Sequence, residues 1–131
     1  MESMEPLFTF RDKVFQHRDA LRATLGTLKA QGAKVLGYGA STKGNVLLQF
    51  CGLTSEDLPL IGEINPEKFG AFTPGTGIPI VSEGVMHQEN PDVLLVLPWH
   101  FRESIIQREH SFIARGGRLL FPLPDIGFFP H

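Results

Sequence analysis

The fold follows from the segment Val35-Leu36-Gly37-Tyr38-Gly39-Ala40-Ser41-Thr42-Lys43-Gly44-Asn45, in which an apolar run breaks into a glycine-rich turn. An amphipathic segment comes next, so the order predicts a strand, a tight loop and a helix. Gly37 and Gly39 let the backbone turn sharply and approach a ligand. The first amides of the following helix attract an anion. We therefore predict a binding loop for a phosphate-sized group.

Lys43 lies in the first turn of the predicted helix, where a positive charge opposes the helix dipole at a cost of up to roughly 1 kcal/mol. This placement favours a negatively charged ligand, and a solvated surface lysine is the alternative. The loop is not a P-loop because Lys43 precedes Gly44, and Thr42 occupies the third glycine position of a dinucleotide fingerprint. Glu63 follows Gly39 by about 24 residues, where nucleotide-binding folds place a carboxylate on a ribose.

Composition excludes several classes of protein. With 131 residues and 42% hydrophobic content, the chain predicts one domain over residues 1–131, with residues 1–7 and 123–131 irregular. A net charge of -2 without a Lys/Arg cluster argues against nucleic-acid binding. The longest apolar run, residues 93–97, is far shorter than a membrane span, and no signal-peptide pattern is present, so we expect a cytoplasmic protein. Cys51, the single cysteine, has apolar neighbours and is predicted to be a buried thiol.

Strand-like and helix-like segments alternate along the chain, which predicts an α/β fold. Amphipathic spacing predicts an N-terminal helix over residues 10–28, a short helix ending near Gly52, and a helix over residues 102–115. The predicted strands are residues 34–37, 60–63, 78–81, 93–97 and 118–121. Short turns favour a mostly parallel sheet of about five strands in the order 3-2-1-4-5, within a Rossmann-like three-layer sandwich.

Ligands bind such sheets beyond the carboxyl ends of the strands, near the point where the strand order reverses. This rule collects the candidate substrate-binding residues Tyr38, Gly39, Ala40, Ser41, Thr42, Lys43, Asn45, Glu63, Asn65, Trp99 and His100. Trp99 offers a flat face for a base or sugar, or is a half-buried rim residue. His100 donates to a ligand oxygen, or is a structural histidine.

Other polar residues give no catalytic or metal site. Ser41 lacks a histidine–acid partner and the context of a nucleophile elbow, so capping the helix or contacting a phosphate is its expected role. The other four histidines, including His17 and His87, have no metal-binding spacing and are predicted to lie on the surface or on a helix face. Glu83 is predicted to be solvated.

Four blocks of the sequence together resemble the C-terminal domain of the sugar C-methyltransferases, and the resemblance covers about residues 8–125. They read Gly37-Tyr38-Gly39-Ala40-Ser41-Thr42-Lys43-Gly44-Asn45, Glu63-Ile64-Asn65-Pro66-Glu67-Lys68-Phe69-Gly70, Pro74-Gly75-Thr76-Gly77-Ile78-Pro79-Ile80 and Leu97-Pro98-Trp99-His100-Phe101. The resemblance implies a Rossmann-like domain that helps to form a nucleotide-sugar site. Glu63 stands where the family pattern often has aspartate.

Members of that family use S-adenosylmethionine to methylate a nucleotide-linked deoxysugar. The resemblance further implies a zinc-binding part and a central donor-binding domain, which precede this domain in the full-length proteins and are missing from this sequence. We therefore expect no catalytic residue, metal or cofactor in this chain, and a donor-binding domain supplied in cis or in trans. A stand-alone module for a dinucleotide or coenzyme A, and a non-catalytic interaction domain, are the alternative functions.

Overall fold

The computed structural model describes the backbone of residues 5–131 and the side chains of residues 12–131. Within these residues, six strands form one sheet in the order β3-β2-β1-β4-β5-β6. They are β1 (Val35–Tyr38), β2 (Ile61–Glu63), β3 (Ile80–Ser82), β4 (Val93–Val96), β5 (Arg118–Phe121) and β6 (Gly127–Phe129). The first five strands pair in parallel, so the predicted order is confirmed.

The sixth strand corrects the prediction that residues 123–131 are irregular. β6 pairs antiparallel with β5, and Phe128 lies opposite Leu120. Phe128 and Phe129 pack against different core clusters, as expected because successive side chains of a strand point to opposite faces of a sheet. The proline-punctuated sequence obscured this short edge strand.

The centre of the sheet is formed by β1 and β4. All four residues of each strand are buried, and the pairing runs from Val35 opposite Val93 to Tyr38 opposite Val96. A strand covered on both faces needs a continuous apolar run rather than an alternating one. The loops that follow these two strands therefore meet at the carboxyl edge of the sheet.

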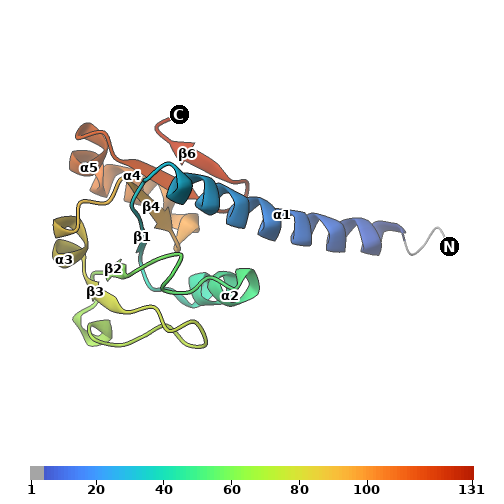
Figure 1. Cartoon of the computed structure of the whole chain (residues 1–131), viewed down its shortest axis with the longest axis horizontal. Helices are drawn as coiled ribbons and strands as arrows, with labels where there is room; N and C mark the ends of the chain where they lie inside the picture. The colour runs from blue at the N-terminus through green and yellow to red at the C-terminus, as the bar shows by residue number, and fades with distance from the viewer. Residues whose placement is uncertain (1–4) are drawn as a thin grey trace.

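Helices cover both faces of the sheet and complete a three-layer sandwich (Figure 1). Leu95 belongs to the core cluster shared with α1 (Glu5–Ala30) and α2 (Thr42–Cys51). Leu94 belongs to the opposite cluster, shared with α3 (Glu83–Gln88), α4 (Arg102–Arg108) and α5 (His110–Ala114). The N-terminal part of α1 extends beyond the edge of the sheet (Figure 1).

Helix boundaries differ from the prediction in three places. Residues 5–7, predicted to be irregular, begin α1, and residues 1–4 lie outside the described part of the chain. The predicted helix over residues 102–115 is divided at Glu109 and is preceded by a 3-10 turn, η3 (Trp99–Phe101). The short helix α3 was not predicted. Along residues 5–131, each helix is too short or too polar to cross a membrane.

Glycines allow two helices to approach the sheet closely. A Cβ atom at Gly44 would lie 2.6 Å from the Cβ of Leu97, and one at Gly62 would lie 2.8 Å from Met86. Gly44 thus provides the close helix–sheet contact that the third glycine of a dinucleotide fingerprint provides elsewhere. This explains why Thr42 can occupy the fingerprint position without loss of packing.

Cys51 ends α2 inside the core. Its side chain is 2% exposed, which confirms the predicted buried thiol, and burial raises its pKa. Arg22 of α1 donates to the carbonyl oxygens of Cys51 and Gly52 at 2.5 and 3.2 Å. Gly52 adopts the left-handed conformation (φ 65°) that commonly ends a helix. These contacts hold α2 against α1.

Candidate functional site

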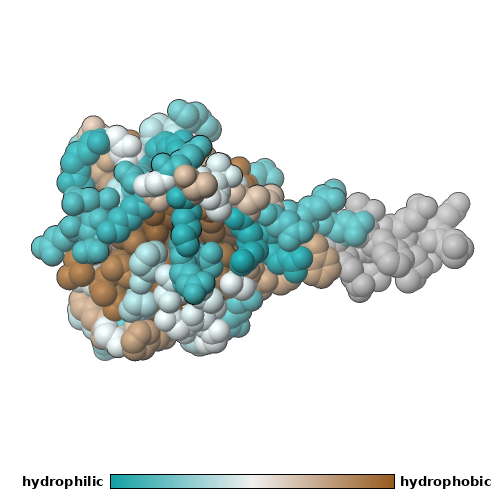
Figure 2. All heavy atoms as spheres, viewed as in Figure 1, coloured by the Kyte–Doolittle hydropathy of each residue, from teal (hydrophilic) through white to brown (hydrophobic). Residues whose placement is uncertain are grey.

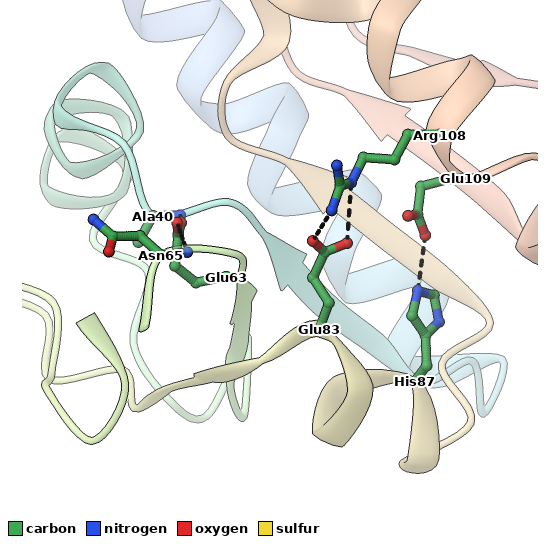
Figure 3. A network of polar contacts seen from close by, with 7 residues as sticks. All are labelled: Ala40, Glu63, Asn65, Glu83, His87, Arg108 and Glu109. Atoms are coloured by element: carbon green, nitrogen blue, oxygen red, sulfur yellow. Dashed lines mark hydrogen bonds and ion pairs between the residues drawn. The ribbon is translucent and has the colours of Figure 1, made fainter. Parts of the chain in front are cut away.

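The glycine loop after β1 is held by bonds to the neighbouring strand. The Ala40 amide donates to Oε1 of Glu63 at 2.7 Å, and the Ala40 carbonyl accepts from Nζ of Lys68 at 2.5 Å. Oε2 of Glu63 accepts from the Asn65 amide at 2.9 Å, so one carboxylate joins both loops (Figure 3). The backbone N–H and the backbone carbonyl of Ala40 are therefore both bonded before any ligand arrives.

These bonds give Glu63 a structural task. Each of its oxygens accepts a backbone amide, and charge-assisted bonds of this kind are about twice as strong as neutral ones. Ser41 caps α2, because its Oγ accepts from the Gly44 amide at 3.0 Å. The capping role of Ser41 is confirmed, whereas ribose binding by Glu63 stays a prediction.

Pro98 covers the glycine turn. Gly39 has φ 79°, and a Cβ atom there would lie 2.8 Å from ring carbons of Pro98. In dinucleotide-binding folds the second glycine lets the backbone approach a pyrophosphate. Here Gly39 approaches Pro98 instead, so a proline ring occupies the space directly over the turn.

Two cavities open beside this covered turn. One, which we call the polar cavity, has a volume of about 380 Å³ and lining residues that include Gly39, Ala40, Ser41, Glu63, Lys68 and Arg108. The other, the apolar cavity, has a volume of about 360 Å³ and lining residues that include Val14, Lys43, Val46, Leu47, Phe50 and Trp99. The chain passes between them at Pro98 and Trp99, because Pro98 lines the polar cavity and Trp99 lines the apolar cavity.

The predicted site residues are therefore divided. Tyr38, Gly39, Ala40, Ser41 and Glu63 line the polar cavity, and Lys43 and Trp99 line the apolar cavity. The remaining four, which line neither of these two cavities, are Thr42, Asn45, Asn65 and His100.

The last three have distinct environments. Oδ1 of Asn65 accepts from the Glu67 amide at 3.1 Å and caps a 3-10 turn, η2 (Pro66–Lys68). Oδ1 of Asn45 is buried and has no hydrogen-bond partner among the described residues. His100 is exposed, and its ring centroid lies 4.3 Å from that of Phe101.

A polar network on the α3–α4 side was missed by the sequence analysis. Arg108 of α4 donates to both oxygens of Glu83 at 2.8 and 3.5 Å, and Figure 3 shows the two side chains pointing toward each other. Burial, followed by Glu83 and Glu109, raises the pKa of Tyr38 above its usual range, and Arg108 opposes this effect. Glu83, predicted to be solvated, is thus half-buried and paired.

His87 and Glu109 form a second contact in this region. Nε2 of His87 lies 2.8 Å from Oε1 of Glu109, whose side chain is 5% exposed (Figure 3). Burial raises the pKa of Glu109, and His87 opposes the rise. His87 lies on a face of α3 with its side chain 25% exposed, within the prediction, but its contact with Glu109 was not predicted. Ser82 followed by Glu83 is a helix-start signal that could have revealed α3, since Oγ of Ser82 accepts from the Val85 amide.

Comparison with known proteins assigns the family. Residues 1–124 match the model of a family described as the C-methyltransferase C-terminal domain. This chain belongs to that family. C-methyltransferase NovU from Streptomyces niveus is 36% identical over 108 residues, which are 82% of this chain and 26% of the relative. The chain therefore spans about a quarter of the length of this curated member of the family.

The family implies S-adenosylmethionine in its full-length members. In this chain the glycine turn is covered by Pro98, and both oxygens of Glu63 hold backbone amides. The described residues therefore do not fit a methyl donor placed over the turn, as a nucleotide-binding fold would place it. Among the described residues, no group of three or more His, Cys, Asp or Glu side chains is placed so that it could hold a zinc ion.

Proposed function

We propose that this chain is a nucleotide-sugar-binding domain of a C-methyltransferase. It positions a nucleotide-linked deoxysugar, and a separate domain supplies S-adenosylmethionine and transfers the methyl group. The donor-binding domain acts in cis or in trans. On this proposal the chain is cytoplasmic and contributes binding and orientation rather than a catalytic residue.

The polar cavity carries the proposal. The residues that line it include two serines, Ser41 and Ser104, two acidic residues, Glu63 and Glu83, and the basic residue Arg108. Sugars offer several hydroxyl groups that both donate and accept, so a lining of mixed donors and acceptors suits them. Phe101 and Ile105 add apolar surface suited to the methyl group of a deoxysugar. In Figure 2 apolar surface is visible between polar side chains near the middle of the face shown.

A dinucleotide or coenzyme A module is the weaker candidate. Such a ligand requires an open glycine turn for its pyrophosphate, and the ring of Pro98 lies there. The alternative of a purely structural interaction domain does not account for two cavities that each reach the size of small-molecule sites, roughly 300–1,000 Å³.

Amide shifts of the chain titrated with a dTDP-linked ketodeoxysugar test the proposal. We expect the first shifts at Gly39–Asn45, and no micromolar binding of S-adenosylmethionine or methyl transfer by the chain alone. Lys43→Ala should weaken the nucleotide sugar by about 1–3 kcal/mol, as expected for a charge-assisted contact. Lys29→Ala is the matched control, because Lys29 lines neither cavity. Failure of the wild-type chain to bind the nucleotide sugar would overturn the proposal.

A further inference from the structure

Among the residues that line the apolar cavity, the function proposed above uses Lys43 alone. The cavity, with a volume of about 360 Å³, lies between the side chains of α1, α2, Trp99 and the loop after β5. That loop is fixed to α1, because Nε2 of His17 lies 2.5 Å from the carbonyl oxygen of Pro122. The cavity is therefore a built feature of the fold, with walls from four separate segments.

Its walls suit a flat apolar ring. Val46 is 63% exposed and Phe50 is 40% exposed, so α2 presents apolar side chains to solvent where it borders the cavity. Trp99 is half-buried and packs against both core clusters. The imidazole of His100 meets the indole edge-on, with centroids 6.0 Å apart and an interplanar angle of 83°. These contacts hold the indole in place, and an aromatic face fixed in this way favours ring stacking.

Positive charge stands at the rim of this apolar cavity. Lys13 of α1 and Lys43 of α2 both line it, although the chain as a whole has a net charge of -2. Lys43 forms no ion pair with any of the described residues. A ligand that joins an apolar ring to a negative group therefore matches both the walls and the rim.

The geometry points to the apolar cavity as the nucleobase subsite for the nucleotide-linked sugar. The base lies against Trp99, the diphosphate lies at Lys43, and the sugar reaches the polar cavity beyond Pro98. This arrangement rests on the proposed function, and it adds a specific division: the apolar cavity recognises the nucleotide, and the polar cavity recognises the sugar. A domain with this division binds a free nucleoside diphosphate without any sugar.

The fluorescence of Trp99 provides the test, because the chain contains one tryptophan. Thymidine diphosphate should change the emission of Trp99 and protect the same amides as the nucleotide sugar, whereas inorganic pyrophosphate should not shift the Trp99 ring resonances. Val46→Gln places a neutral polar group in the cavity wall and should weaken thymidine diphosphate about tenfold. Val85→Gln, on α3 and 44% exposed, is the matched control and should leave binding unchanged.

Two results would overturn the subsite while leaving the proposed function intact. In the first, the nucleotide sugar binds, but Val46→Gln and Val85→Gln both retain wild-type affinity. In the second, Val46→Gln disrupts association with a methyl-donor domain and leaves the affinity for thymidine diphosphate unchanged, which would make the cavity a protein interface. No binding of the nucleotide sugar by the wild-type chain would instead overturn the proposed function and the subsite together.

Discussion

The polar and apolar cavities border the same glycine turn but use their charged groups in opposite ways. In the polar cavity, Glu63 and Lys68 hold the Ala40 peptide, and Arg108 is paired with Glu83. In the apolar cavity, Lys43 has no ion pair among the described residues. The comparison teaches that one cavity offers a ligand polar groups already held in place by internal hydrogen bonds, while the other offers a lysine that forms no ion pair with any described residue.

This difference suggests a division of labour. Groups fixed by internal hydrogen bonds lose little entropy when a ligand arrives, so they favour precise orientation. Burying apolar walls against a ligand lowers the free energy of the complex, so such walls favour affinity. Each prediction below changes one feature of this comparison.

The largest expected effect comes from crowding the contact between Gly39 and Pro98. Gly39→Ala adds a Cβ atom 2.8 Å from Pro98 at a residue with φ 79°. Left-handed strain and the overlap together should lower the free energy of unfolding by about 2–4 kcal/mol. Gly70→Ala is the matched control, because φ is 84° and the added atom meets nothing within 4 Å, so only about 1 kcal/mol should be lost.

Denaturant unfolding of the two variants measures this difference. Equal losses would contradict the tight contact between Gly39 and Pro98. A larger loss for Gly39→Ala, with the affinity for thymidine diphosphate retained, would sharpen the comparison, because the apolar cavity would then work without an intact contact between Gly39 and Pro98.

A smaller effect is expected from the carboxylate that orders the polar cavity. Glu63→Gln replaces one acceptor oxygen with an NH2 group, which is a donor and cannot accept the backbone N–H that it faces. Stability should therefore fall by about 1–3 kcal/mol. Amide exchange at Ala40 and Asn65 should accelerate with it. Glu67→Gln, on the exposed turn η2, should change neither quantity. Unchanged exchange at Ala40 in Glu63→Gln would show that the polar cavity is not held by this bond.

The fold was more predictable than the site. The order of the parallel strands followed from the alternation of strand-like and helix-like segments joined by short turns, and continuous apolar runs such as residues 93–97 located the strands. The short helix α3 and the strand β6 depend on tertiary contacts, namely the fit of Met86 against Gly62 and of Phe128 beside Leu120. Segments of three to six residues carry too little periodicity to predict.

For the site, sequence could place residues at one edge of the sheet but could not divide them. The position of Trp99 and Ser41 after neighbouring strands was predictable. That Pro98 would cover Gly39 was not, because this contact depends on how the loop after β4 folds. The structural use of Glu63 was hidden for the same reason: a carboxylate at the end of β2 has the same sequence signal whether it meets a ribose or a backbone amide.

The smallest expected effect concerns Glu109 and depends on pH. Because burial raises the pKa of Glu109 above its ordinary value of 4.5, the folded chain binds this proton more tightly than the unfolded chain does. The contribution of Glu109 to stability is therefore complete below about pH 4.5 and declines as pH rises through the native pKa.

Unfolding free energies of wild type and Glu109→Gln, compared from pH 4 upward, should show this decline only in the wild type. Glu56→Gln, on an exposed turn, serves as the control and should follow the wild type. A wild-type advantage that instead grows with pH would mean that the ion pair with His87 outweighs the effect of burial.

The buried thiol of Cys51 is a built-in probe of local opening in this chain. A thiol-specific alkylating reagent needs both access and a thiolate, and the fold withholds each, since the side chain is 2% exposed and burial raises the pKa. Alkylation must therefore wait for α2 to detach from α1. The alkylation rate therefore measures how often the C-terminal end of α2 opens. The same helix forms one wall of the apolar cavity. A ligand that bridges α1 and α2 would slow the alkylation of Cys51, and a ligand confined to the α3–α4 side would leave the alkylation rate unchanged.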